Sequence, residues 1–302
     1  MVALELLGFV FYSTAWYLLI RATGHRIRYI TCQGITFASI FAGMTMPSGI
    51  FLEAARCILG SKESGMKLGE SAATVVLHRI LYVAGFLLCT ALAFSLLVFQ
   101  GTVRSSTVYD LAAIPVVSII GLLTLLAVSL SPRRLRPLLN RIVRYVEPLI
   151  KLVQKEVQME DKTDKFLLEY HLGFRKMLSA EICIAASFIA SLGDWACSVA
   201  ILWIAVLALG VNVSLWAIIV TMAIGKMIQM TPIAIPGMLG IYEAAVTATL
   251  SMFSVPVAVA ASAALLLRIV TTWLDLPVTG IAAYHYGFKL LTRMPLSPVL
   301  KN

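Results

Sequence analysis

Charged residues are scarce in this sequence, and the patterns of a soluble enzyme site are missing. Only 13% of the 302 residues are charged and 60% are hydrophobic, whereas about a quarter of a typical soluble domain is charged. Five cysteines and four histidines are scattered along the chain, and their spacing predicts neither a disulfide framework nor a metal site. No glycine-rich nucleotide loop or nucleophile motif occurs. We therefore expect no cofactor, no metal and no catalytic residue.

Long continuous apolar stretches predict an all-α, polytopic transmembrane helical bundle. A transmembrane β-barrel would instead show short segments with alternating hydrophobicity. The first stretch has no basic region before it and carries Glu5, so we interpret it as a retained span and not a signal peptide. The chain is predicted to form one integral membrane domain over residues 1–302. Its predicted spans are residues 2–20, 71–100, 109–131, 178–209 and 257–286.

Basic residues gather outside the predicted spans. Lys and Arg outnumber Asp and Glu by 24 to 15, and they concentrate in residues 21–28, 133–176 and 289–301. This positive-inside pattern argues against a nucleic-acid partner and predicts a multi-pass protein of the plasma membrane. The N-terminus is then outside, and the basic linker, residues 132–176, and the C-terminus are cytoplasmic. Apolar residues recur at helical spacing in the linker, which predicts an amphipathic helix on the anionic leaflet or on the cytosolic ends of the spans.

One short motif occurs twice in the chain. A proline, glycine and the triplet Glu-Ala-Ala occur within residues 47–55 and again within residues 236–245. Each copy is followed by a lone arginine in an apolar stretch, Arg79 and Arg268, which lie 26 and 25 residues after the glutamate. Charged residues inside a membrane are expensive, so a duplicated set indicates a polar functional site.

The two motifs fall in the remaining apolar segments, residues 30–60 and 214–254. Each segment is long enough for one helix, a break and a shorter returning helix. We therefore predict two re-entrant helical hairpins. The loop charges place them on opposite faces, so that residues 2–100 and 178–286 form an inverted repeat joined by the span 109–131 and the linker. The alternative is that both segments are plain spans that the prolines and glycines kink.

Charged residues and glycines around the motifs form the candidate substrate site. An unpaired guanidinium presents a planar fork to phosphate, so Arg79 and Arg268 are candidate ligands for a lipid headgroup. Ion pairs with the motif glutamates, Glu53 and Glu243, are the alternative. The free amide groups at the start of the second returning helix are suited either to capping Glu243 or to cradling a phosphate. The full predicted set is Arg79, Arg268, Lys226, Glu53, Arg56, Glu243, Gly237 and Gly240.

Two further acids lie within predicted spans. Asp194 directly precedes a tryptophan, and Asp275 follows another tryptophan by two residues. Either acid is a candidate for a protonatable coupling group. Hydrogen bonding between helices is the commoner use of such residues and stays open here.

The residues around these motifs resemble the integral-membrane, flippase-like domain of the lysylphosphatidylglycerol synthase family. The C-terminal match is a Pro-Gly-x-Leu-Gly-x-x-Glu element, here Pro236 to Glu243, with Arg268 in the next span. In the N-terminal half the chain has Pro47, Glu53 and Arg56, without the family's glycine before the acid, and His78-Arg79 where the family has Glu-Arg. The resemblance covers about residues 28–287 and implies a stand-alone form without the soluble aminoacyltransferase domain.

These patterns lead to one main functional hypothesis and two alternatives. The chain is expected to translocate a phospholipid or a lipid-linked anion by alternating access at a polar site near the membrane midplane. It could instead be an enzyme or membrane subunit in aminoacyl-lipid or glycosyl-lipid synthesis, which would need a donor-binding domain. A scaffold is the third hypothesis and predicts self-paired charges without a cavity. Expected partners are membrane phospholipids or lipid-linked intermediates, with a homo-oligomer or a partner synthase as further options.

Overall fold

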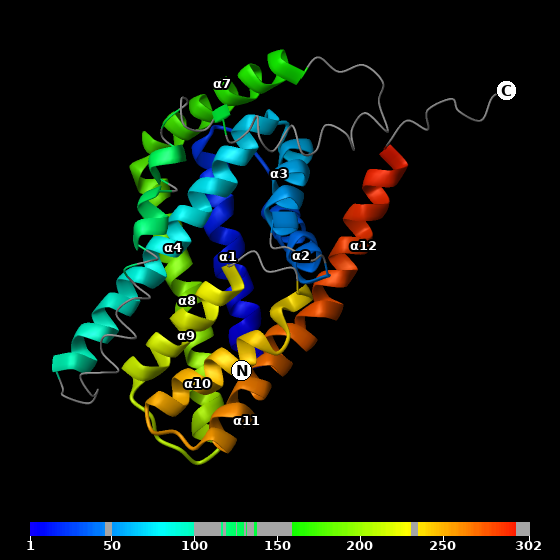
Figure 1. The fold of residues 1–302 in the computed structure, drawn as a ribbon. Coiled ribbons are helices and arrows are strands. Elements are labelled where there is room, and N and C mark those ends of the chain that lie inside the picture. The colour runs from blue at the N-terminus through cyan, green and yellow to red at the C-terminus, as the bar shows by residue number, and fades with distance from the viewer. Residues whose placement is uncertain are drawn as a thin grey trace.

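The structure is a computed structural model that describes residues 1–45, 50–99, 159–230 and 235–293, with short stretches between residues 116 and 137. All regular secondary structure in these residues is helical, which confirms the predicted all-α fold. Figure 1 shows the helices as one bundle. In chain order they are α1 (Val2–Ala22), α2 (Tyr29–Thr45), α3 (Ile50–Ser64), α4 (Leu68–Phe99), α7 (Met159–Leu178), α8 (Glu181–Ala208), α9 (Leu215–Met230), η1 (Pro236–Met238), α10 (Ile241–Met252), α11 (Val257–Arg268), η2 (Ile269–Trp273) and α12 (Asp275–Arg293).

Four helical stretches of the described chain are long and apolar enough to cross a membrane. They are α1, α4, α8 and the stretch Val257–Tyr286, in which α11, the π-helical turn η2 and most of α12 follow one another. Long helices suit a membrane because they satisfy their backbone hydrogen bonds internally. A multi-pass membrane protein is therefore confirmed. About half of the predicted span 109–131 lies outside the described residues. Within the span, residues 116, 119–124 and 126–129 are described as helical.

Both motif-containing segments are divided into shorter helices. Helix α2 ends at Thr45 and α3 begins at Ile50, and the break between them, with Pro47, lies outside the described residues. In the second segment, α9 ends at Met230, and the 3-10 turn η1 precedes α10. We call α2 and α3 the first helix pair, and α9, η1 and α10 the second helix pair. The division into two helices occurs where it was predicted, while re-entrant insertion and the inverted repeat stay predictions.

The two helix pairs occupy opposite halves of the bundle and meet at their tips. In Figure 1, α2 and α3 lie in the upper half of the view, and α9 and α10 lie in the lower half. A Cβ atom built on Gly237 in η1 would lie 4.0 Å from the carbonyl oxygen of Met44 in α2. Helix α2 also packs against α12, and α9 packs against α4 and α10. The tips of the two helix pairs therefore lie next to each other, with α2 packed on η1.

The largest apolar core forms where α8 meets α9, α10 and α11. Trp195, Leu202, Ile218, Val246 and Ala264 are buried in this cluster. Burial of such side chains stabilises the arrangement mainly through close packing, because the lipid around the bundle is as apolar as the core itself. The second helix pair is thus fixed against α8 and α11 on one side, which leaves its tip near the middle of the bundle.

Helix α7 packs closely along the start of α4. A Cβ on Gly69 would collide with the backbone of Phe166, and one on Gly173 would lie 2.9 Å from Cγ of Glu70. Glycine at both positions permits this close approach of two helices. Helix α7 contains the last part of the predicted linker 132–176 and continues beyond it to Leu178. Most of the remaining linker, including the amphipathic stretch, lies outside the described residues.

Candidate functional site

The acid and the arginine of the second motif form a short ion pair. Glu243 lies in the first turn of α10 and Arg268 ends α11, and the distance between Arg268 Nε and Glu243 Oε1 is 2.7 Å. The other carboxylate oxygen of Glu243 accepts a hydrogen bond of 2.7 Å from the backbone N–H of Gly240, which has a φ of 85°. Glycine suits this left-handed conformation because it has no Cβ. Glu243 therefore caps the helix and pairs with Arg268 at the same time.

Arg268 uses its remaining donors on the tip of the second helix pair and on η2. Its guanidinium donates to the backbone carbonyl of Gly237 and, over 2.9 Å, to Oγ1 of Thr272. The guanidinium carbon also lies 4.6 Å from the ring centroid of Tyr242. Arg268 is only 4% exposed. Charged hydrogen bonds and a cation–π contact together hold this side chain in one orientation.

The first motif has a looser arrangement in which one acid serves two arginines. Glu53 in α3 lies 3.6 Å from Nε of Arg79 in α4 and 3.7 Å from a terminal nitrogen of Arg56. Arg56 is fully buried, lies 4.5 Å from the ring centroid of Trp16 and donates a 3.1 Å hydrogen bond to the hydroxyl of Tyr12. The side chain of Arg79, by contrast, is 32% exposed. Arg79 is therefore held less tightly than its counterpart Arg268.

A single cavity of about 250 Å³ connects the two arginines. Six residues of the predicted set, counting the two coupling candidates, lie on its wall: Arg79, Lys226, Gly237, Arg268, Asp194 and Asp275. The other four, Glu53, Arg56, Glu243 and Gly240, are not on the wall, although both glutamates contact its arginines. Apolar side chains from α1, both helix pairs and neighbouring helices complete the wall, among them Phe9, Ile40, Met44, Leu52, Met222, Ile235 and Met238.

Lys226 is the cation of this cavity with the least local compensation. In the described part of the chain no carboxylate lies within ion-pair distance of its ammonium group. It still interacts through space with Glu5, Asp194 and Asp275. Asp194 in turn interacts with the side chain of Tyr82 on α4, which lines the same cavity. The cavity thus brings cations and acids together without pairing all of them.

Glu5 is the residue that the sequence-based prediction missed. It lies in the first turn of α1 and lines the same cavity as Asp275. The one available signal was that Glu5 is the only charged residue in the first apolar stretch before Arg21. No motif surrounds it, so nothing in the sequence linked it to residues at the other end of the chain. Among the described residues, no three His, Cys, Asp or Glu side chains are grouped so as to hold a metal ion.

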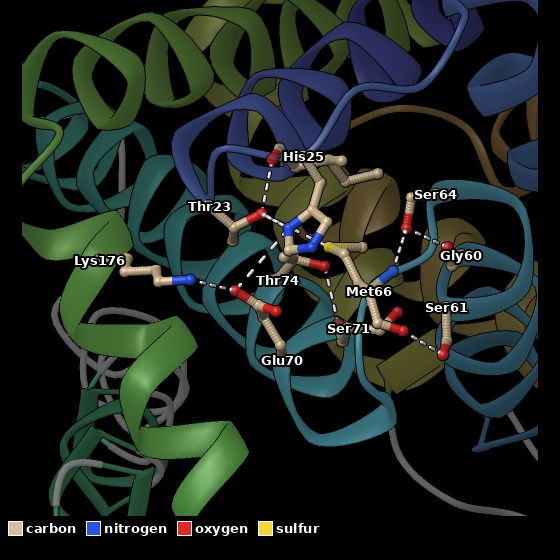
Figure 2. A network of polar contacts seen from close by, with 11 residues as sticks. Thr23, His25, Gly60, Ser61, Ser64, Met66, Glu70, Ser71, Thr74 and Lys176 are labelled. Atoms are coloured by element: carbon tan, nitrogen blue, oxygen red, sulfur yellow. Dashed lines mark hydrogen bonds and ion pairs between the residues drawn. The ribbon is translucent and has the colours of Figure 1, made fainter.

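A second cavity, of about 550 Å³, lies beside α7 and the start of α4. Figure 2 shows the polar network at its wall. Nζ of Lys176 donates a 2.9 Å hydrogen bond to Oε1 of Glu70, and Nδ1 of His25 lies 3.8 Å from the same oxygen. The distance between Oγ1 of Thr23 and Nδ1 of His25 is 3.2 Å. The network joins the end of α1, the start of α4 and α7, and none of the predicted site residues lies there.

Comparison with known families gives one match. The family model for the lysylphosphatidylglycerol synthase TM region matches residues 1–278 of this chain. That range includes every residue on the wall of the first cavity. No match was found among curated proteins or among solved structures.

Proposed function

We propose that this chain, which belongs to the family of lysylphosphatidylglycerol synthase transmembrane regions, moves a phospholipid or a lipid-linked anion between the leaflets of the cell membrane. One observation carries the proposal. Arg79, Lys226 and Arg268 come from α4, α9 and α11 and line one cavity at the tips of the two broken helix pairs. Charged side chains and broken helices at one place in a membrane protein are typical of a substrate pathway.

The three cations have different roles in this proposal. Arg268 directs its donors to Glu243, Gly237 and Thr272, so it positions the tip of the second helix pair. Arg79 and Lys226 make no hydrogen bond to another described residue, and Arg79 makes only an ion pair of 3.6 Å with Glu53. Their N–H donors are therefore available to a phosphate. We therefore assign phosphate binding mainly to Arg79 and Lys226, since charged donors bind phosphate strongly.

The size and lining of the cavity fit the headgroup of a lipid and not its tails. A volume of about 250 Å³ lies just below the usual range for drug-sized ligands of about 300–1,000 Å³. Its apolar wall residues, such as Met44 and Ile235, lie next to the polar ones. In our proposal the polar headgroup crosses through the cavity while the acyl chains remain in the surrounding lipid, which spares the headgroup contact with hydrocarbon.

Movement of the two halves past the cavity completes the proposed mechanism. We propose that residues 2–100 and 178–286 act as an inverted repeat and expose the cavity to each leaflet in turn, as such repeats do in secondary transporters. The N-terminus would face outside, with the basic linker and the C-terminus in the cytoplasm. A partner synthase that supplies the lipid, or a second copy of the chain, remains part of this hypothesis.

The scaffold hypothesis has some support, and the cavity argues against it. It predicts self-paired charges, and both glutamate–arginine pairs do form. It also predicts that no cavity exists, whereas the structure has a cavity that Arg79 and Lys226 line. The enzyme hypothesis gains no specific support from the described residues.

A leaflet assay with purified protein tests the proposal. Proteoliposomes carry trace fluorescent phosphatidylglycerol or phosphatidylcholine, and dithionite quenches only the outer leaflet. We expect the wild type to accelerate loss of the protected fluorescence. Arg79→Gln should slow this rate roughly tenfold or more, because a charged hydrogen bond is worth about 1.5–3 kcal/mol.

Lys62→Gln is the matched control. Lys62 is an exposed cation near the end of α3, outside the cavity, so its loss should leave the rate unchanged. Absence of any acceleration by the wild type with either lipid would refute the proposal. Equal rates for wild type and Arg79→Gln would refute the assignment of the phosphate ligand.

A further inference from the structure

The wall of the cavity carries as many acids as cations. Glu5 on α1, Asp194 on α8 and Asp275 at the start of α12 lie on the same wall as Arg79, Lys226 and Arg268. Phosphate binding explains the cations only. Carboxylates repel a phosphate, so their presence at a lipid-anion site requires a separate explanation.

Two of these acids are direct neighbours. Glu5 and Asp275 line the same cavity, and their carboxyl groups interact with each other. Asp275 is 3% exposed, and its Oδ1 has no hydrogen-bond partner in the described part of the chain. Two ionised carboxylates that interact in a poorly solvated site repel each other severely. One shared proton removes the repulsion and makes the contact a hydrogen bond.

We propose that Glu5 and Asp275 form a carboxyl pair that binds one proton at neutral pH, and that this proton crosses the membrane together with the anionic headgroup. The coupling part rests on the lipid translocation proposed above, whereas proton binding by the pair does not. The pair joins α1 to the last spanning stretch, so its protonation state acts on the contact between the first and the second half of the chain.

The surrounding charges determine the sign of the coupling. Arg79 and Arg268 are already paired with Glu53 and Glu243, and Asp194 interacts with Tyr82. The phenols of Tyr12 and Tyr242 also face the cavity. Lys226 is the cation without a carboxylate at ion-pair distance in the described residues, and it acts on the Glu5–Asp275 pair through space.

Phosphate and proton therefore favour each other's binding. A phosphate on Lys226 neutralises the cation that stabilises a second negative charge on the pair, so the pair keeps its proton while the headgroup is bound. When the headgroup leaves, Lys226 again weakens proton binding by the pair, and the proton is released more readily to water on that side. One anionic charge and one proton move together, and the step transfers no net charge.

Infrared spectroscopy tests proton binding without any lipid assay. The purified wild-type protein should show a carboxylic-acid C=O stretching band at neutral pH that disappears at alkaline pH. Glu5→Gln and Asp275→Asn should each lose this band, while Glu181→Gln, an exposed acid at the start of α8, should retain it. Absence of the band from the wild type, or its persistence in both variants of the pair, would overturn the proposal. Glu5→Gln also serves as the milder variant, since Glu5 is less buried than Asp275.

A pH gradient across proteoliposomes tests the coupling. Fluorescent phosphatidylglycerol should accumulate in the leaflet on the alkaline side, up to about tenfold per pH unit for one proton per lipid. A protonophore with a potassium ionophore should abolish the accumulation, and Glu5→Gln should do the same. Lipid movement that ignores the gradient would overturn the coupling while leaving translocation established. A wild type that moves no lipid would refute the proposed function and the coupling, and the infrared band would then decide proton binding alone.

Discussion

The two motif arginines should contribute very differently to stability. Arg268 is 4% exposed, pairs with Glu243 at 2.7 Å and donates to Thr272 and the carbonyl of Gly237. Arg79 is 32% exposed and lies 3.6 Å from its carboxylate. The same substitution, arginine to glutamine, at these corresponding positions separates a buried ion pair from a partly solvated one.

The expected magnitudes follow from burial and geometry. Breaking a buried ion pair by removing one partner costs about 3–5 kcal/mol, and Arg268→Gln also leaves the carbonyl of Gly237 without its donor. A solvent-screened pair is worth about 0.2–1 kcal/mol, so Arg79→Gln should be close to the wild type. We therefore expect the two variants to differ by about 3 kcal/mol in their free energy of unfolding.

Unfolding in mixed micelles with increasing dodecyl sulfate, followed by tryptophan fluorescence, measures this difference. The double variant Arg268→Gln/Glu243→Gln should be less destabilised than the sum of the two single variants, because each single change leaves a buried charge alone. Equal destabilisation by Arg79→Gln and Arg268→Gln, or additive effects in the double variant, would refute the reasoning.

Two further predictions concern packing. Gly225→Ala places a Cβ 2.8 Å from the ring of Tyr242 and should destabilise the protein by about 1–3 kcal/mol in the same unfolding assay. Gly121→Ala, whose Cβ would have no atom of the described residues within 4 Å, is the neutral control. Lys176→Gln removes the 2.9 Å bond to the buried carboxylate of Glu70, so amide hydrogen exchange should increase in α7 and remain unchanged in α10; unchanged exchange in α7 would show that apolar packing alone holds this helix.

Much of the fold could be predicted because hydrophobicity and helix breakers are local signals. Apolar length located α1, α4 and α8, and the second motif marked the interruption between α9 and α10. The pairing of Glu243 with Arg268 was one of two alternatives, because spacing along the chain does not decide whether an arginine contacts an acid or a ligand. The structure shows the ion pair, together with a cap at Gly240.

Other features depend on contacts between distant segments and left no local pattern. Arg56 lies over the ring of Trp16 from α1, a contact that spacing within α3 could not reveal. Glu5 and Asp275 are brought together only when the first and last spanning stretches pack beside the same cavity. A lone acid in an apolar helix indicates that the residue has a function, but only the tertiary structure identifies the residue with which it interacts.

The way Arg268 holds the backbone of Gly237 has a mechanical consequence. Two bonded groups, the carboxylate of Glu243 and the carbonyl of Gly237, attach the tip of the second helix pair to Arg268 of α11. The tip of the second helix pair and α11 must therefore move together as one rigid body. Across the tip, Gly237 faces the carbonyl oxygen of Met44, which a Cβ built on the glycine would approach to 4.0 Å, and no hydrogen bond joins these two residues in the described structure. Separating these two residues costs only dispersion energy, so the boundary between Met44 and Gly237 is a place where the two helix pairs can move apart.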